Sequence, residues 1–539
     1  MDFKPYIIIQ IIFLAFVLAF IIHEIRITGA SSSKERKLAV YTLLILFIGI
    51  LLRSINLSYP HGVFVDEAMG AYDSWSLANY GVDSNLASYP VYLKSWGTGQ
   101  SALYAYLALP FIKLLGLNVE AYRLPMSLIS CLALIVLYKT LKKSQQSGSL
   151  VFCITAFLAI NPWHIIKSRF AVDCNICPDL VLIGICLIIL SLYTQHRKTG
   201  LTVAGFSLLA LSAYGYGVSW MVLPFIFILG FLYLYRKKYL SIKQEIIAVS
   251  ISFLILLPLI LFAFTLFFKL EQFTIGPVTI TQLSDGRHND TTLFGSGHFI
   301  QQFLLYLKYA YKVVVLGVDN LNVSSLPVSG IFYNIISLPF LILGIYKGYK
   351  EKSVVNDIFL IWLISCLPMH LIVEPTINHW NLLWFPVIYF TGYGIFKFIE
   401  IGQTNFVIIG SIYSISFLLF LRNYFDREVY KPFNSYTFEK EIKFTKDHHF
   451  NKIFYPKDFT HSYTLFYTPV SPYIFAKTFV SDGRMLSTGL SYANISFGLP
   501  DIQPISKTAY VISNQQLPSI DLNLFRIQKG EYYSVLWND

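Results

Sequence analysis

Two adjacent carboxylates, Asp66 and Glu67, follow shortly after a long apolar run at residues 38–57. Acids beside a bilayer are costly unless they meet water, a cation or a substrate. In a chain with many membrane spans, such a pair is a candidate functional site. The alternative is a solvated loop that carries acids by chance. Position alone does not separate the two interpretations.

Basic residues on the same predicted side of the membrane could stabilise an anionic group. A guanidinium binds phosphate bidentately, which favours arginine in this role. The candidates are Lys94, Arg123, Arg169 and Arg287. Each cation also has a structural interpretation. Arg123 could snorkel to lipid headgroups, Lys94 could be a solvated loop charge, and Arg169 could pair with Asp173 four residues on.

Aromatic and histidine side chains on this side could contact a substrate. We take as candidates for substrate binding His61, Trp96, Trp163, His164 and His379. Tryptophans near span ends also serve as membrane anchors. A divalent metal (Mg, Mn or Zn) is left open, since no compact ligand motif is present. Cys174 and Cys177 have CxxC spacing but no second pair, and the six cysteines do not indicate a disulfide framework.

The composition indicates which elements must position these residues. The chain of 539 residues is 55% hydrophobic and 13% charged, whereas soluble domains carry about 25% charged residues. Its mean hydropathy is +0.57. The sequence therefore predicts a polytopic α-helical membrane protein. The net charge of +11 lies mostly in short loops between apolar spans, so it does not indicate a nucleic-acid partner.

Segments long and apolar enough to span a bilayer fix the expected topology. We predict about 12 spans, near residues 6–23, 38–57, 122–138, 149–162, 178–195, 200–214, 217–235, 246–268, 329–346, 354–373, 380–398 and 404–422. Alternate loops are rich in Lys and Arg and are expected to face the cytoplasm. The loop with Asp66 then faces out, as do both termini. Residues 1–23 are interpreted as an uncleaved helix rather than a signal peptide.

The outer side carries two long loops, residues 58–121 and 269–328. Each contains an apolar aromatic stretch, near 101–115 and 303–318, which predicts an interfacial or re-entrant helix. After about residue 423 charges become frequent. Short β-like runs follow at 463–467, 473–480 and 509–513.

We expect three parts. Residues 1–37 form an extra N-terminal helix with a cytoplasmic loop, residues 38–422 the catalytic membrane domain, and residues 423–539 a small extracytoplasmic domain, α/β or β-rich.

Asp-Glu just after a span resembles the GT-C superfamily of membrane glycosyltransferases, in particular the protein O-mannosyltransferase and lipid A aminoarabinose transferase branch. The resemblance covers roughly residues 38–422. Further stretches fit it, namely Gly99–Tyr106, Tyr122–Pro125, Asn161–Arg169, Ala171–Asn175 and the loop ending at Ser284–Arg287. One stretch departs from the pattern: His379 follows Asn378 where many relatives carry an Asn-Arg pair.

The resemblance implies a sugar donor on a polyprenyl phosphate and transfer, usually with inversion, at the outer face of the cell membrane, or at the lumenal face in a eukaryote. It makes the four cations Lys94, Arg123, Arg169 and Arg287 candidates for binding the donor phosphate. It implies Asp66 as general base, with Glu67 orienting it or binding the acceptor. Asp173 matches an acidic position on the second outer loop. An acceptor polysaccharide, glycolipid or protein, and the surrounding membrane lipids, complete the expected partners. The rival interpretations are a transporter or flippase for a lipid-linked saccharide and a membrane scaffold. Against a transporter, the ionisable residues gather at one face and no repeat is visible.

Overall fold

The computed structural model describes residues 5–27, 33–95, 99–194, 198–283, 293, 299–319, 325–327, 329–426, 435–481 and 489–539. The chain packs as two units, each assembled from separated stretches. Unit 1 comprises Met1–Asn56, Met126–Leu257 and Arg287–Asp426, and unit 2 comprises Leu57–Pro125, Pro258–Gly286 and Arg427–Asp539. The loop at residues 58–121 and the C-terminal tail thus share one unit, a grouping that the three consecutive parts expected from sequence do not include.

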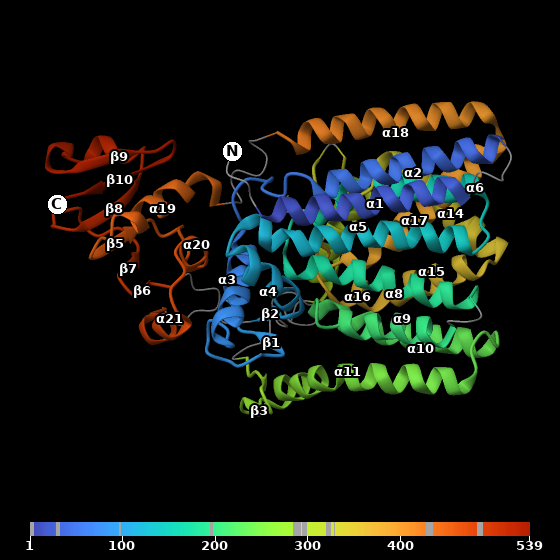
Figure 1. The fold of residues 1–539 in the computed structure, drawn as a ribbon, viewed down its shortest axis with the longest axis horizontal. Coiled ribbons are helices and arrows are strands. Elements are labelled where there is room, and N and C mark those ends of the chain that lie inside the picture. Colours follow the sequence, from blue (N-terminus) through green and yellow to red (C-terminus); the bar gives the residue numbers. More distant parts are fainter. Residues whose placement is uncertain are drawn as a thin grey trace. The chain divides into compact units, whose positions relative to one another are not determined.

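Unit 1 is a bundle of helices, of which α2, α6, α14 and α17 run side by side (Figure 1). Its helices, with α5 and α11 continuing into unit 2, are α1 (Tyr6–Ile27), α2 (Ser33–Ser54), α5 (Val119–Lys143), α6 (Gly148–Ala159), α7 (Pro162–Ser168), α8 (Ile176–Leu192), α9 (Lys198–Ser212), α10 (Leu223–Arg236), α11 (Ile242–Phe268), α13 (Phe299–Tyr311), α14 (Asn334–Glu351), α15 (Val354–Ser365), α16 (Leu367–Ile372), α17 (Trp384–Ile401) and α18 (Gln403–Tyr424). Short helical turns lie between some of them, at η2 (Asp173–Asn175), η3 (Gly217–Met221), η4 (Lys312–Leu316) and η5 (Asn381–Leu383).

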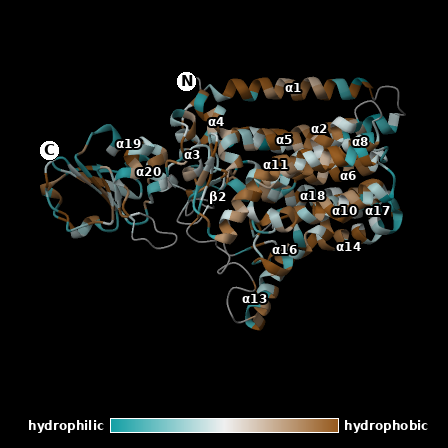
Figure 2. Cartoon of the chain, turned by 90° about the horizontal axis from the view of Figure 1, so that it is seen from below, coloured by the Kyte–Doolittle hydropathy of each residue, from teal (hydrophilic) through white to brown (hydrophobic). Residues whose placement is uncertain are grey.

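Among the described residues, eight helices are long and apolar enough to cross a membrane, or nine if α6 and α7 form one bent span. The long helices are coloured mostly as hydrophobic in Figure 2. The chain is therefore an integral membrane protein. The other three expected spans form α9, α10 and α14, which lie outside this set. The count of about 12 thus stays a prediction.

The bend between α6 and α7 has a local cause. Asn161 caps α7 by accepting a hydrogen bond from the backbone N–H of His164, and Pro162 follows at the first helical position. Both residues favour a new helix start over continuation of α6. The two helices meet at 53°. This break turns the segment that carries Trp163 and His164 away from the axis of α6.

Glycines let helices of unit 1 approach closely. A Cβ at Gly344 in α14 would overlap the carbonyl oxygen of Phe390, and one at Gly394 in α17 would overlap that of Phe340. Gly184 of α8 and Gly205 of α9 are related in the same way. Helices inside lipid lack a hydrophobic driving force for association and rely on van der Waals packing. Small residues at such crossings allow the backbones to approach closely enough for that packing.

Gly344→Ala is accordingly expected to push α14 and α17 apart and to cost at least about 1–3 kcal/mol, as overpacking does. Gly410→Ala in α18 is the control, because a Cβ there meets nothing within 4 Å. The thermal midpoint of the detergent-purified protein should fall for Gly344→Ala and stay level or rise for Gly410→Ala. Equal midpoints for the two variants would contradict close packing at this crossing.

Unit 2 contains elements from the loop at residues 58–121, from the loop at residues 269–328 and from the tail. The loop elements are α3 (Val65–Tyr80), β1 (Tyr92–Leu93), β2 (Gln100–Ser101), α4 (Leu103–Leu115), β3 (Phe273–Ile275) and β4 (Val278–Ile280). The tail elements are η7 (Ser435–Thr437), α19 (Glu439–Asp447), β5 (Lys452–Tyr455), α20 (His461–Tyr467), α21 (Pro472–Thr478), β6 (Ser491–Tyr492), β7 (Ile495–Phe497), β8 (Thr508–Ser513), η8 (Leu517–Ser519), η9 (Leu522–Leu524), β9 (Arg526–Lys529) and β10 (Tyr533–Trp537). Helices do form in both aromatic loop stretches, as α4 and α13.

The tail strands form one mixed sheet in the order β6-β7-β5-β8-β10-β9. β5 is parallel to both β7 and β8, while β8, β10 and β9 are antiparallel. One face of the sheet buries Tyr510, Ile512 and Leu536.

The strand predicted at 509–513 is confirmed as part of β8, but those predicted at 463–467 and 473–480 are wrong. Both form helices, α20 and α21. Pro472 at the first position of α21 favours a helix start, and α20 is held by packing against α3 rather than by strand pairing.

Candidate functional site

Asp66 lies in the first turn of α3, where its side chain is half-exposed. The helix dipole favours a negative charge at this end. The backbone carbonyl of Asp66 accepts a hydrogen bond from Gln100 Nε2 at 3.3 Å. Helix α20 of the tail packs on α3 and carries Tyr463. Burial, and secondarily the charges of Asp66 and Glu67, raises the pKa of the Tyr463 hydroxyl. Asp66 is thus a partly exposed carboxylate at a helix start.

Glu67 is fully buried and forms a bidentate ion pair with Arg123. Arg123 Nε donates to Glu67 Oε1 at 2.8 Å and Nη2 donates to Oε2 at 2.7 Å. Glu67 also accepts a hydrogen bond from the backbone N–H of Phe64 at 3.0 Å, the reach-back contact of a helix N-terminus. These contacts favour a structural role for Glu67, as the anchor of the α3 start.

Arg123 is equally enclosed, and its remaining N–H groups bind the loop before α3. Nη1 donates to the carbonyls of Leu57 and Pro60, and Nη2 donates to that of Gly62. All five guanidinium N–H groups are therefore directed at protein acceptors. In this structure Arg123 neither snorkels to headgroups nor presents an N–H to a phosphate, and it fixes the loop that leads to Asp66.

Arg169 closes a helix end in unit 1. Its Nη1 donates to the carbonyls of Leu52 at 2.8 Å and Ile55 at 2.6 Å, and Nη2 donates to that of Asn56. These are the last carbonyls of α2 and the residues after it, which lack partners within the helix. Asp173 begins η2, and α7 ends at Ser168, so Arg169 and Asp173 do not share one helix face. The contacts of Arg169 again favour a structural role.

The remaining candidates differ in exposure. Lys94 is half-buried and donates from Nζ to Gln272 Oε1 at 3.1 Å, which leaves donor capacity on its ammonium. His61 is exposed and meets the ring of Tyr59 edge-on. His379 is half-buried, with Nδ1 at 2.9 Å from the carbonyl oxygen of Glu374. Trp96 and Arg287 lie outside the described residues.

Trp163 and His164 are completely buried in unit 1. Trp163 packs edge-on against Phe385, so its ring faces offer no platform for a sugar. His164 accepts at Nδ1 from Arg53 Nε at 2.9 Å and lies 2.9 Å from Asp179 Oδ1 through Nε2. In this conformation neither side chain is open to a substrate, and both belong to the interior of the bundle.

His164 is part of a closed network that the sequence interpretation missed. Asp179 also accepts from Lys167 and from Ser130, and Arg53 also donates to the last carbonyls of α6, Leu158 and Ala159. The signal was present, since Arg53 and Asp179 are lone charges within predicted apolar spans. Because these groups bond to one another with no exposed surface, the network ties α2, α5, α7 and α8 together and gives no support to a transport path.

A second missed feature is a pair of buried carboxylates in unit 2, Asp73 and Asp83. Asp73 Oδ1 accepts from the N–H of Ser84 at 2.8 Å, while Asp83 Oδ1 accepts from those of Asn85 and Ala87. Oδ2 of each is buried and accepts no hydrogen bond from a described residue. Burial, and secondarily the charge of Asp83, raises the pKa of Asp73 to about 8. Burial raises the pKa of Asp83 to about 6.

This pair predicts a stability that falls with rising pH. An unfolded Asp has a pKa of about 3.9, so the folded state binds the Asp73 proton more tightly. Between about pH 4 and pH 8 the folded state holds a proton that the unfolded state has released. The free energy of unfolding therefore falls by up to about 1.4 kcal/mol for each unit that the pH rises. Asp73→Asn is uncharged at every pH and should flatten this dependence and raise the thermal midpoint at pH 8.5. Exposed Asp501 provides the control Asp501→Asn, which should keep the wild-type slope. An unchanged slope in Asp73→Asn would contradict the assignment.

No group of three or more His, Cys, Asp or Glu side chains that could hold a metal occurs among the described residues. The six cysteines are buried and form no disulfide. The divalent metal left open from the sequence stays a prediction.

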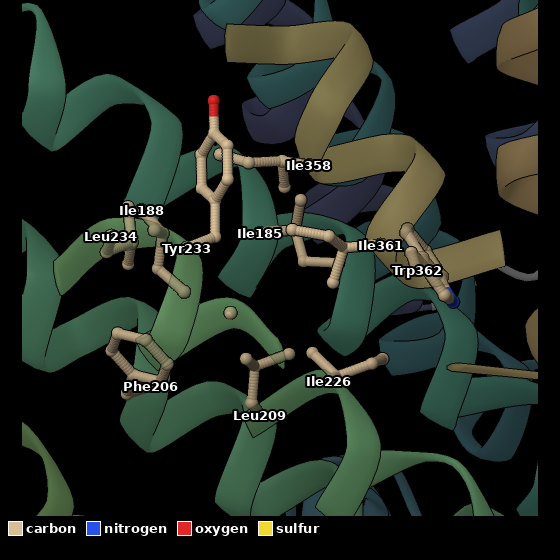
Figure 3. Close-up of a pocket in the computed structure, with 11 residues that line it drawn as sticks. Ile185, Ile188, Phe206, Leu209, Ile226, Tyr233, Leu234, Ile358, Ile361 and Trp362 are labelled. Carbon is tan, nitrogen blue, oxygen red and sulfur yellow. The ribbon is translucent and has the colours of Figure 1, made fainter. Parts of the chain in front are cut away.

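A small apolar cavity lies between α8, α9, α10 and α15 (Figure 3). Its volume of about 30 Å³ is far below the roughly 300–1,000 Å³ of typical ligand pockets. The lining residues are Ile185, Ile188, Phe206, Leu209, Ile226, Gly230, Tyr233, Leu234, Ile358, Ile361 and Trp362. The hydroxyl of Tyr233 is directed to Asp357 Oδ2 at 2.9 Å. A cavity this small and apolar is a packing gap of the bundle and does not hold a sugar.

Comparison with solved structures gives extensive matches at low sequence identity. The apo structure of ArnT from Cupriavidus metallidurans matches 94% of this chain and 98% of its own, with 11% identity and a TM-score of 0.53. The same protein bound to undecaprenyl phosphate matches 93% and 97% at 11% identity, with a TM-score of 0.49. The oligosaccharyltransferase AglB from Archaeoglobus fulgidus, in complex with an inhibitory peptide and a dolichol-phosphate, matches 82% of this chain and 64% of its own, with 12% identity and a TM-score of 0.48. No protein-family model and no curated protein sequence matches the chain. The first match shows a shared fold over nearly the full length of both chains.

Proposed function

Because this chain has the GT-C fold, we propose that it is a membrane glycosyltransferase that takes its sugar from a polyprenyl-phosphate carrier. The acceptor is a cell-surface polysaccharide, a glycolipid or a protein at the outer face. The observation that carries the proposal is an accessible carboxylate, Asp66, on a helix start that buried contacts hold in place. ArnT of Cupriavidus metallidurans, whose fold this chain shares, has been solved with undecaprenyl phosphate, a carrier of the proposed class.

In the proposed reaction Asp66 is the general base. It takes the proton from the acceptor hydroxyl as that oxygen forms a bond to C1 of the sugar. The bond from C1 to the lipid phosphate breaks, and the phosphate leaves with the electron pair. Attack from the opposite side inverts the configuration at C1.

The leaving phosphate needs cationic stabilisation rather than a strong acid. Lys94 suits this role among the described candidates, since within the described part of the chain one acceptor, Gln272 Oε1, engages its ammonium. Arg287 and Asp173 remain candidates by resemblance alone. Arg123 and Arg169 act through position instead, by fixing the segments before α3 and after α2.

The test uses cells that lack the chain. They should lose one surface glycan and accumulate its lipid-linked sugar donor, and re-expression should reverse both changes. The purified chain in detergent should then consume the accumulated lipid-linked sugar and release polyprenyl phosphate when an acceptor extract is added. A flippase would restore the glycan in cells but would leave the donor intact in detergent, and that result would reject the transferase.

A further inference from the structure

The segment that carries Asp66 is held on one side by Arg123 and on the other by the C-terminal tail. Val63, three residues before Asp66, is buried and exchanges two hydrogen bonds with Ser435. The Val63 N–H donates to Ser435 Oγ at 3.1 Å, and the Ser435 N–H donates to the Val63 carbonyl at 3.1 Å. Both polar groups of the Val63 backbone are therefore bonded to a residue 372 positions away in sequence.

Ser435 is itself fixed by the tail. Its hydroxyl lies 2.6 Å from that of Tyr467, at the end of α20, and both residues are buried. Ser435 Oγ accepts from the Val63 N–H and also hydrogen-bonds to the Tyr467 hydroxyl, with either hydroxyl able to donate, so hydrogen bonds connect Val63 to Tyr467 through Ser435. We call Val63, Ser435 and Tyr467 the tail latch.

The latch is one of several contacts between the tail and α3, which lie side by side in Figure 1. Tyr72 donates to the carbonyl of Val470 at 2.7 Å, and Ser462 contacts the sulfur of Met69 at 3.7 Å. Burial, and secondarily the charges of Asp66 and Glu67, raises the pKa of the Tyr463 hydroxyl, as expected for a residue of α20, which packs on α3. These contacts follow α3 from its first turn to its middle.

We propose that the C-terminal tail is a positioning element for the Asp66 carboxylate, acting through the tail latch. This inference rests on the proposed function and adds to it a role for residues 435–467. Arg123 fixes the loop up to Gly62 and Glu67 fixes the helix from its third residue. Val63 is the backbone link between these anchors, and the tail holds it. Misplacing a catalytic group by about 1 Å can cost about 100-fold in rate.

The test replaces latch hydroxyls one at a time in the full chain. Ser435→Ala leaves the buried Val63 N–H without its acceptor, and Tyr467→Phe removes the second link. Tyr455→Phe is the matched control, because the Tyr455 hydroxyl lies 2.6 Å from Thr445 Oγ1 inside the tail, away from Val63. Ser435→Thr keeps the hydroxyl and is the rescue variant.

Hydrogen exchange of the detergent-purified protein measures the protection of the Val63 amide by the tail latch and needs no substrate. Exchange at the Val63 amide should rise about 10- to 100-fold in Ser435→Ala and stay at the wild-type rate in Tyr455→Phe and Ser435→Thr. In cells lacking the chain, glycan restored per folded molecule should fall about 10- to 100-fold for Ser435→Ala and recover with Ser435→Thr.

Two outcomes would overturn the inference. One is wild-type glycan formation in Ser435→Ala although Val63 exchange has risen, and the other is an equal loss in Tyr455→Phe. Asp66→Asn in the same assay separates this failure from failure of the proposed function, because a glycosyltransferase with Asp66 as base loses the glycan there whatever the latch does.

Discussion

Asp66→Asn is expected to give folded protein at the wild-type level that forms the surface glycan about 100- to 10,000-fold more slowly, the usual contribution of a general base. The amide has nearly the shape of the carboxylate but does not take a proton. The side chain is half-exposed at a helix start, so loss of its charge costs about 0.3–1 kcal/mol of stability. The measurement is glycan per folded molecule in cells lacking the native chain.

Asp458→Asn is the matched control, since it removes an exposed aspartate of the tail in the same unit. It should leave both glycan and yield unchanged. A pH profile adds a second readout. If Asp66 is the base, residual activity of Asp66→Asn loses the acidic limb of the wild-type profile. Retained transfer in Asp66→Asn would exclude this carboxylate as the base.

Arg123→Gln is expected to cost about 3–5 kcal/mol of folding free energy, because it leaves the Glu67 charge buried without a partner. The double variant Glu67→Gln/Arg123→Gln removes both charges and should recover part of that loss. The readout is the thermal midpoint of each detergent-purified variant. Arg123→Lys should also be destabilised, since an ammonium does not reproduce the fork to Glu67 and the three carbonyls.

Arg526→Gln is the control for this series, because Arg526 pairs with Asp539 at an exposed position. Exposed ion pairs contribute about 0–1 kcal/mol. Additive effects of Glu67→Gln and Arg123→Gln would contradict a coupled pair. If Arg123 instead bound the donor phosphate, Arg123→Gln would keep its stability and lose turnover, so the series also decides between the two roles.

The position of Asp66 could be predicted, but its surroundings could not. A carboxylate soon after an apolar run is visible in sequence, and so is the loop that must carry it. The partner of Glu67 is 56 residues away, and that of Val63 is 372 residues away. Nothing local in the sequence marks Ser435 as a partner of Val63, because a single buried serine has no periodic signal.

Partners distant in sequence also explain why two predicted phosphate-binding arginines have structural contacts instead. From sequence, Arg123 could snorkel to headgroups and Arg169 could pair with Asp173, but a guanidinium can bind a phosphate or a set of backbone carbonyls, and the local sequence does not distinguish these partners. The structure directs both at carbonyls. Trp163 and His164 follow the Asn161–Pro162 helix start into the bundle, whereas their place near a predicted span end suggested a surface.

The sequence by itself determined the class of the protein, because apolar length, low charge and loop asymmetry follow from composition and local order. It also determined Asp66 as the residue to test, since an acid beside an apolar span is a local pattern. Only the tertiary structure decided that Glu67 is a buried anchor, that 463–467 is a helix packed on α3, and that the tail holds Val63. The physical reason is that burial and hydrogen-bond pairing depend on residues distant in sequence, and these decide whether a charge is free to react or fixed in place.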